Sequence, residues 1–364
     1  MIANLQLLRG LAALGVVFYH TAFTFNGGVH TEFQGVSVFF VISGFIMTYI
    51  TREDSSQFLV QRLVRIVPLY WLCTLPLVAI WFKGGGRAWT DDYSIANIAK
   101  SLFFLPYQDA SGNIQPLLAV GWTLNIEMFF YAVFALSLAI SRRWAPLLTC
   151  AALIAAKIVH GQLGCTALLC KFYAHDYTTF LIAGIVSFYI WKALESHAFG
   201  RRLIVAPLGL ISVVIFMLWN VDPPFAAATQ QLFPFPLYYL MPPMLVISVL
   251  LLHSAQLQWK WRFALLMGDA SYALYLTHTI IIEIYRVGRN KLVGDQIAIL
   301  DPKDSVYAMG AMLVICSLIA VVVHTRIELP ILRWLRRKFV ARPDLSIRRP
   351  KPDAPPCVTC RSES

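Results

Sequence analysis

Residues 5–25 read LQLLRGLAALGVVFYHTAFTF, an apolar run long enough to cross a lipid bilayer. A hydrocarbon core about 30 Å thick requires roughly 20 apolar helical residues, because each residue adds about 1.5 Å to a helix. The run follows no basic segment and contains Arg9 and His20, which a cleaved secretory signal would not have. We therefore interpret it as the first transmembrane helix.

Further apolar runs of similar length follow along the rest of the 364-residue chain. The chain is 58% hydrophobic and only 13% charged, whereas soluble domains are about 25% charged. This composition excludes both a soluble enzyme and a disordered chain. We predict an all-α polytopic membrane protein with about ten transmembrane helices, at residues 5–25, 35–51, 66–82, 122–140, 144–160, 177–192, 204–220, 237–253, 269–287 and 306–326.

Charge placement predicts two regions and an orientation. Residues 1–332 form the predicted integral-membrane domain, and residues 333–364 form a basic, Pro-rich tail that we expect to be disordered and cytoplasmic. An inner amino terminus puts 21 of the 30 Lys and Arg residues on the inner side. Basic residues favour the cytoplasmic side of a membrane, so both termini are predicted to be cytoplasmic. The net charge of +11 therefore needs no nucleic-acid partner.

The seven cysteines give few clues to function. Cys165 and Cys170 would be able to pair only if their loop faces an oxidising compartment. Cys357 and Cys360 form a lone C-x-x-C in the polar tail, without a second pair of ligands nearby. No metal site is predicted.

Ionisable residues inside membrane spans are costly, which makes each one a candidate for function. Arg9 and His20 are eleven residues apart and project from one helix face, about 16 Å apart along the axis. Arg9 is then expected at the cytoplasmic mouth and His20 near the middle of the bilayer. The alternative is a snorkelling arginine and a structurally hydrogen-bonded histidine. For His20 we favour function, because imidazole titrates near neutrality and can act as a nucleophile.

Arg62 and Arg65 lie on one helical face at the start of the third span. Two guanidinium groups in this arrangement can bind a pyrophosphate, although an orientation signal explains them equally well. Glu127 lies in the outer half of the fourth span and is predicted to orient His20 or to make a structural hydrogen bond. Arg326 and Glu328 are predicted to form a local ion pair, with Pro330 ending the last span.

Ser271, Tyr275 and His278 follow a spacing of four and then three residues, so they share a face of the ninth span. Tyr272, beside them, has the character of an interface anchor. The chain contains no P-loop, no H-E-x-x-H and no G-x-S-x-G. ATP-driven transport, zinc proteolysis and serine-elbow hydrolysis therefore have no support in the sequence.

Five blocks follow one another along the chain: LRGLAA at 8–13 with His20 behind it, GVSVFFVISGF at 35–45, RLVRIVPLY at 62–70, WTLNIEMFFY at 122–131 and SYALYLTH at 271–278. In this order they resemble the membrane acyltransferase-3 family, and most closely its ExoZ-like exopolysaccharide O-acetyltransferases. The resemblance covers roughly residues 5–330. The family often has two acidic residues where this chain reads Ile126-Glu127-Met128, which puts a second carboxylate in doubt here.

The resemblance implies a bacterial inner-membrane O-acyltransferase. It would move an acyl group, expected to be acetyl, from acyl-CoA to a hydroxyl of exopolysaccharide or of its lipid-linked oligosaccharide precursor. Acetyl-CoA would be a co-substrate, and no cofactor would be bound permanently. A transporter or flippase of lipid-linked saccharide is the alternative.

The candidate residues have distinct expected roles. Arg9, Arg62 and Arg65 would hold the phosphates of coenzyme A at the inner mouth. His20 would act as a general base or accept the acyl group as an acyl-imidazole. The remaining candidates would orient the base or stabilise the oxyanion: Glu127, Ser271 and His278.

Overall fold

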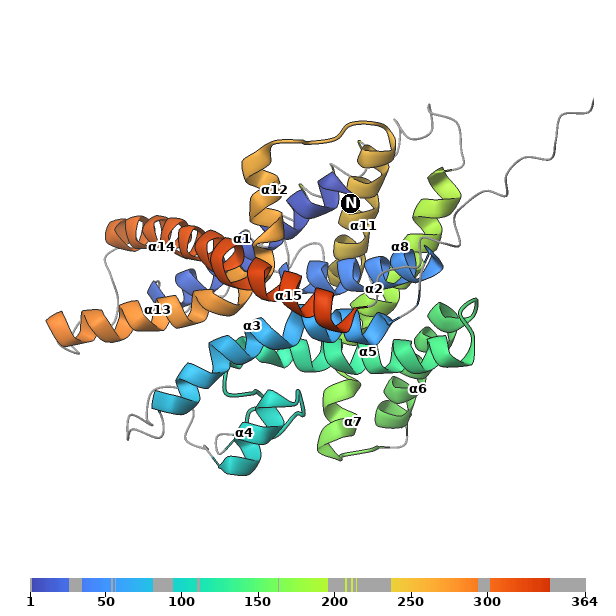
Figure 1. Cartoon of the computed structure of the whole chain (residues 1–364), viewed down its shortest axis with the longest axis horizontal. Coiled ribbons are helices and arrows are strands. Elements are labelled where there is room, and N and C mark those ends of the chain that lie inside the picture. Colours follow the sequence, from blue (N-terminus) through green and yellow to red (C-terminus); the bar gives the residue numbers. More distant parts are fainter. Residues whose placement is uncertain are drawn as a thin grey trace, which may run out of the picture.

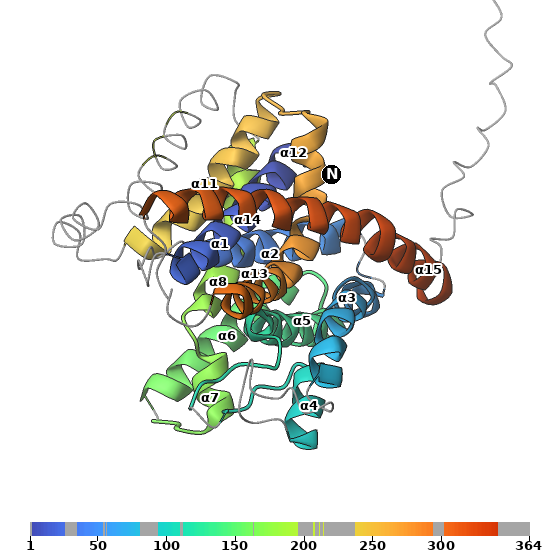
Figure 2. The same cartoon turned by 90° about the vertical axis from the view of Figure 1, so that its left-hand side faces the viewer.

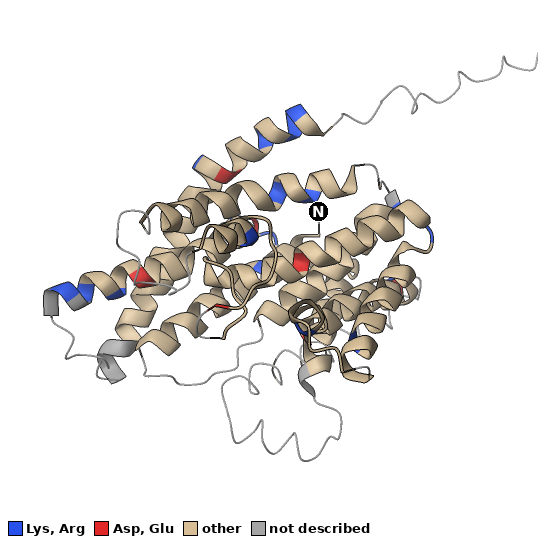
Figure 3. Ribbon diagram, turned by 90° about the horizontal axis from the view of Figure 1, so that it is seen from below, with Lys and Arg blue, Asp and Glu red and all other residues tan. Residues whose placement is uncertain are grey.

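The computed structural model describes residues 2–25, 35–53, 55, 57–80, 94–109, 112–162, 164–195, 207, 211, 214, 237–293 and 302–340. Within these ranges every regular element is a helix, and the sole strand-like feature is an isolated bridge between Gln108 and Ile114. Figure 3 shows Lys and Arg mainly towards helix ends, with few charges along the bundle.

Among the described residues, seven helices are long and apolar enough to cross a membrane, and this confirms the predicted fold class. Six of them are α1 (Ala3–Phe25), α2 (Gly35–Glu53), α3 (Phe58–Ile80), α5 (Trp122–Ile140), α6 (Ala145–Gln162) and α8 (Tyr177–Glu195). The seventh is a 34-residue run, Val306–Phe339, made of α14 (Pro302–Val323) and α15 (Leu329–Phe339).

Two of the predicted spans have a less regular form. The predicted ninth span consists of α12 (Arg262–Asp269) and α13 (Ser271–Val293), which meet at a bend of 68°. In the apolar helix α11 (Leu237–Ser254), the stretch that qualifies as apolar, Tyr239–Ser254, is shorter than the seven long spans. Of the predicted span at 204–220 only residues 207, 211 and 214 are described, so the number ten remains a prediction.

The centre of the bundle is α2, which packs against α1, α8 and α11 (Figure 1). Gly44 of α2 and Gly184 of α8 let the two backbones touch. A Cβ atom on Gly44 would lie 2.2 Å from the carbonyl oxygen of Leu181, and one on Gly184 would lie 2.2 Å from that of Val41. Small residues permit such close contacts between membrane helices.

A second close contact fixes the start of α1. A Cβ atom on Gly268 of α12 would lie 2.1 Å from the carbonyl oxygen of Gln6. Nearby, the Asn4 side chain donates a 2.8 Å hydrogen bond to the carbonyl of Leu257 and accepts a 2.9 Å bond from the amide of Trp259. The segment of α1 that carries Arg9 is thus held against α12 and the chain before it.

The end of the last span differs from the prediction. A π-helical turn, His324–Glu328, joins α14 to α15, so the two form one long rod in Figure 2. Pro330 does not end the helix, because it lies in the first turn of α15, where a missing N–H is tolerated. Glu328 pairs with His324 at 2.7 Å instead of forming the predicted ion pair with Arg326.

The helix also continues beyond the predicted domain boundary at 332, to Phe339. The first part of the predicted disordered tail is therefore helical. Residues 341–364 lie outside the described part of the chain.

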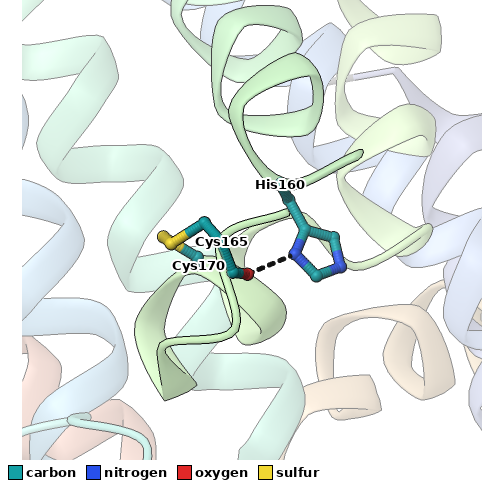
Figure 4. Close-up of a disulfide and its surroundings, with 3 residues drawn as sticks. All are labelled: His160, Cys165 and Cys170. Atoms are coloured by element: carbon teal, nitrogen blue, oxygen red, sulfur yellow. Dashed lines mark hydrogen bonds between the residues drawn. A yellow bond between two sulfur atoms is a disulfide. The ribbon is translucent and has the colours of Figure 1, made fainter. Parts of the chain in front are cut away.

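Two short helices lie on one side of the bundle, α4 (Ile95–Leu102) and α7 (Leu168–Tyr173) (Figure 1). A disulfide joins Cys165, in the connection between α6 and α7, to Cys170 of α7 (Figure 4). Nδ1 of His160 donates to the carbonyl oxygen of Cys165 at 2.9 Å. The ring of Tyr173 stacks on Phe129 of α5, with centroids 4.0 Å apart. These contacts tie α7 to the main bundle.

Candidate active site

A cavity lies among α1, α2, α3, α5 and α13, with an empty volume of about 810 Å³ that includes its open mouth. Apolar side chains of α2 form much of the wall. The polar lining consists of Arg9, Ser43, Arg62, Arg65, Thr123, Glu127, Tyr131, Ser271, Tyr272 and Tyr275.

The three candidate arginines meet in this cavity although they come from two helices. Arg9 of α1 is buried, and its Nη1 donates a 2.9 Å hydrogen bond to Oε1 of Gln6. The amide of Gln6 in turn donates to the carboxylate of Asp269, at the end of α12. On α3, Nε of Arg62 is buried and has no hydrogen-bond partner among the described residues. A buried donor without a partner is costly and indicates a site for an incoming acceptor.

Glu127 lies with the arginines and does not contact His20. Its carboxylate accepts hydrogen bonds from Ser43 of α2 and from Tyr131, one turn further along α5. Glu127 is also within electrostatic reach of Arg9 and Arg62. One carboxylate facing three guanidinium groups leaves positive charge in excess, so the cavity favours an anionic ligand.

The residues predicted to share one face of α13 do not all reach the cavity. Ser271, Tyr272 and Tyr275 line the cavity, whereas His278 does not. The hydroxyl of Tyr272 donates to the carbonyl of Ile66 at 2.7 Å, so Tyr272 joins α13 to α3 and is not an interface anchor. Oγ of Ser271 is buried without a partner among the described residues.

Tyr275 connects the cavity to the histidines. Its hydroxyl lies 2.8 Å from Oγ1 of Thr123 and donates to the carbonyl of Val120 at 2.9 Å. Its ring lies 5.9 Å from the ring of His278, measured between centroids. Tyr275 therefore forms the wall between the cavity and the next part of the site.

His20 and His278 form a pair, with ring centroids 5.1 Å apart. Nδ1 of the buried His278 lies 3.1 Å from the carbonyl oxygen of Leu274. Since a carbonyl can only accept, Nδ1 must donate, and in neutral imidazole Nε2 is then an acceptor. That Nε2 atom is buried and lacks a partner among the described residues. His20 is half-buried, and neither histidine lines the arginine cavity.

The residues predicted to form one site therefore lie in two neighbouring groups, the arginine cavity and the histidine pair. Three residues were missed in the sequence, namely Ser43, Thr123 and Tyr131. All three lie inside blocks that carry the family resemblance, at 35–45 and 122–131, but a hydroxyl group within an apolar run did not single them out as site residues. Among the described residues, no group of three or more His, Cys, Asp or Glu side chains is arranged to hold a metal ion.

A multi-pass helical bundle with this motif order defines the class of membrane acyltransferases. Residues 2–324 match the family model described as an acyltransferase domain, and the chain belongs to this acyltransferase-3 family. It is 32% identical over 312 residues to the exopolysaccharide production protein ExoZ of Rhizobium meliloti (strain 1021). That match covers 84% of this chain and 91% of ExoZ.

Two further relatives are O-acetyltransferases by name. O-acetyltransferase OatA of Staphylococcus aureus (strain NCTC 8325 / PS 47) is 25% identical over 307 residues, which cover 74% of this chain and 49% of OatA. Peptidoglycan O-acetyltransferase OatA of Listeria monocytogenes serovar 1/2a is 28% identical over 153 residues, which cover 38% of this chain and 24% of the relative. No solved structure matches the chain.

These relationships make the protein a membrane O-acyltransferase. They give no support to the alternative of a flippase for lipid-linked saccharide.

Proposed function

We propose that the protein transfers an acetyl group from acetyl-CoA to a hydroxyl of an exopolysaccharide or of its lipid-linked precursor. The observation that carries the proposal is the convergence of Arg9, Arg62 and Arg65 in one cavity. Coenzyme A brings a pyrophosphate and a further phosphate, which guanidinium groups bind well. The likeness to an exopolysaccharide production protein supports the acceptor class.

The disulfide supports the orientation that this reaction needs. Structural disulfides persist in oxidising compartments, so the end of α6 and α7, where Cys165 and Cys170 pair, face the outside of the inner membrane. Following the chain back through α6, α5, α3, α2 and α1, the start of α1 faces the cytoplasm. This agrees with the excess of Lys and Arg on that side. The arginines then face the compartment that supplies acetyl-CoA.

The pantetheine arm of acetyl-CoA extends from the arginines and carries the thioester towards the histidine pair. His20 takes the proton from the acceptor hydroxyl, whose oxygen attacks the thioester carbonyl carbon. The carbon–sulfur bond breaks, and the imidazolium returns its proton to the thiolate of coenzyme A. His278 packs beside His20, with ring centroids 5.1 Å apart, and this contact limits the orientations of the His20 imidazole.

A second route uses His20 as the nucleophile and forms an acyl-imidazole before the acceptor arrives. The two routes differ when no acceptor is present. Enzyme incubated with radiolabelled acetyl-CoA and then freed of ligand keeps label only by the second route.

The decisive test measures transfer itself. The purified full chain in lipid nanodiscs would be incubated with radiolabelled acetyl-CoA and de-O-acetylated exopolysaccharide fragments, and labelled saccharide would be counted. We expect transfer by the wild type and its loss in His20→Ala. The matched control is His253→Gln on α11, which does not line the cavity. Unchanged transfer by His20→Ala would refute the assignment of the base, and wild type that labels no saccharide would refute the proposed acceptor.

A further inference from the structure

A cluster of three aromatic rings lies where α5 and α8 begin. Trp122 opens α5, Tyr177 opens α8, and His175 precedes α8 by two residues. Ring centroids are 5.0 Å apart for Trp122 and Tyr177, 6.0 Å for Trp122 and His175, and 5.2 Å for His175 and Tyr177. The His175 and Tyr177 rings are nearly parallel, at 12°. We call these three residues the aromatic platform.

The platform adjoins the end of the cavity away from the arginines. The ring of Tyr177 lies 5.5 Å from that of Phe40, which lines the cavity. Trp122 directly precedes Thr123, which lines the cavity and contacts Tyr275. Along α5, Thr123, Glu127 and Tyr131 succeed one another at one-turn intervals, so about 12 Å separates the two ends.

Exposure makes the platform available to a ligand. His175 is exposed, and Trp122 and Tyr177 are only partly buried. An interfacial aromatic belt would place such rings singly against lipid. Here His175 stacks on Tyr177, Trp122 meets both rings at tilted angles of 47° and 57°, and Phe40 joins the cluster to the cavity wall.

The connection that carries the platform is firmly held and polar at its rim. Nζ of Lys157 lies 3.6 Å from the carboxylate of Asp176 and donates to the carbonyl oxygens of Ala174 and His175, at 3.1 and 3.2 Å. Just before this connection, the disulfide ties α7 to the segment that precedes it. Flat rings with a few fixed polar groups beside them are typical of sites for small polar molecules.

The surroundings of His175 favour its uncharged form. Partial desolvation of the ring lowers its pKa from the ordinary value of 6.5, Asp176 opposes this shift, and Lys157 lowers the pKa further. A neutral ring is a better stacking surface for an uncharged ligand than an imidazolium, which binds water strongly.

We infer that the aromatic platform of Trp122, His175 and Tyr177 binds a sugar ring of the carbohydrate acceptor, next to the one being acylated. A pyranose presents a flat face of C–H groups that stacks on aromatic rings, and its edge hydroxyls reach the polar groups beside them. The inference rests on the proposed function. It assigns the acceptor to the platform end of the cavity and the donor to the arginine end.

The test separates acceptor binding from donor binding. Full-length Trp122→Ala and His175→Ala would be compared with wild type in nanodiscs, with de-O-acetylated exopolysaccharide oligosaccharides as the acceptor. We expect KM for the oligosaccharide to rise about tenfold or more, since stacking on one aromatic ring is of that order when truncated to alanine. KM for acetyl-CoA should not change. His175→Phe, which keeps a flat ring, should recover most of the affinity.

Trp144→Ala is the matched control, because Trp144 is an exposed tryptophan outside the cavity. Normal KM for acetyl-CoA shows that a variant is folded. If transfer occurs and both platform variants match the control in KM for the oligosaccharide, the inference is overturned while the proposed function stands.

Direct binding of the same oligosaccharides by calorimetry distinguishes the remaining outcomes. Wild type that binds but never acetylates them, with binding lost in Trp122→Ala, would refute the proposed function and support the platform. Wild type that neither binds nor acetylates them would overturn both.

Discussion

The arginine cavity and the histidine pair differ in the kind of buried nitrogen that lacks a partner among the described residues. In the cavity it is a donor, Nε of Arg62, whereas at the histidine pair it is an acceptor, Nε2 of His278. In the cavity, Arg9 is held by Gln6, and Gln6 by Asp269. Glu127 is held by two hydroxyl groups. At the histidine pair, Nε2 of His278 is buried without a partner among the described residues. An unsatisfied buried acceptor costs about 1–3 kcal/mol.

This difference indicates a division of labour. Groups that bind a ligand benefit from being fixed in advance by neighbours, because little order is then lost on binding. A group that takes up and releases protons needs a hydrogen-bonding position that is not already occupied by a neighbouring residue. α1 spans both regions, since it carries Arg9 near its start and His20 near its end.

The largest effect should come from the histidine side. We expect His20→Ala to lower kcat by about 10²–10⁴-fold, the usual contribution of a general base. The affinity for acetyl-CoA should stay within about twofold of wild type, because His20 does not line the arginine cavity. Calorimetry with acetyl-CoA measures the affinity. A comparable loss of kcat and of donor affinity would show that the two regions are not separate.

The converse effect should come from Arg62. We expect Arg62→Ala to raise KM for acetyl-CoA by about 10–100-fold, as a hydrogen bond to a charged group contributes about 1.5–3 kcal/mol. Arg62→Lys should recover only part of this, since lysine cannot bind phosphate in a bidentate manner.

Steady-state kinetics measures the KM values of these variants. Arg286→Ala, exposed near the far end of α13, is the matched control. An unchanged KM for acetyl-CoA in Arg62→Ala would contradict the assignment of the donor to this cavity.

A smaller effect should follow from the contact between α1 and α12. Gly268→Ala puts a methyl group against the backbone of Gln6, so α1 must move at the turn that holds Arg9. We expect a loss of about 1–3 kcal/mol in stability and a higher KM for acetyl-CoA. Thermal unfolding in nanodiscs measures the stability. Gly288→Ala, with open space around it, is the control; equal unfolding temperatures for the two variants would contradict the close contact.

The smallest effect concerns the wall between the regions. Tyr275→Phe keeps the ring but removes its bonds to Thr123 and Val120. Neutral hydrogen bonds contribute about 0.5–1.5 kcal/mol each, so we expect kcat to fall by less than about tenfold at an unchanged KM for the donor. Rapid-quench measurement of acetyl transfer would resolve the change. A loss as large as that of His20→Ala would make Tyr275 part of the chemistry.

The sequence predicted the spans well because apolar length is a local property. Nine of the ten predicted spans overlap described helices, including those of α1, α2 and α3. The bend of 68° between α12 and α13 was not visible, since apolar length does not show where a helix changes direction. Pro330 was misjudged because a proline in a first helical turn looks the same in sequence as one that ends a helix.

The sequence predicted most of the residues of the candidate site, but not which of them lie together. Helical periodicity gives the face of a side chain and its approximate depth, and it brought Arg9 and His20 to one side of α1. It does not say which helix lies opposite that face. Glu127 was therefore assigned to His20, whereas the packing of α2 against α5 gives it Ser43 as a partner.

The long rod of α14 and α15 sets a length that the bilayer has to accommodate. Its 34 residues extend about 51 Å at 1.5 Å per residue, and a hydrocarbon core is only about 30 Å thick. Even at a tilt of about 40° the rod is too long, so its last turns must project among the lipid head groups. Those turns carry Arg336, Arg337 and Lys338, and the Lys338 ammonium lies over the ring of Trp334 at 5.2 Å. Because α15 packs against α3, this basic segment at the membrane surface is mechanically connected to the helix that carries Arg62.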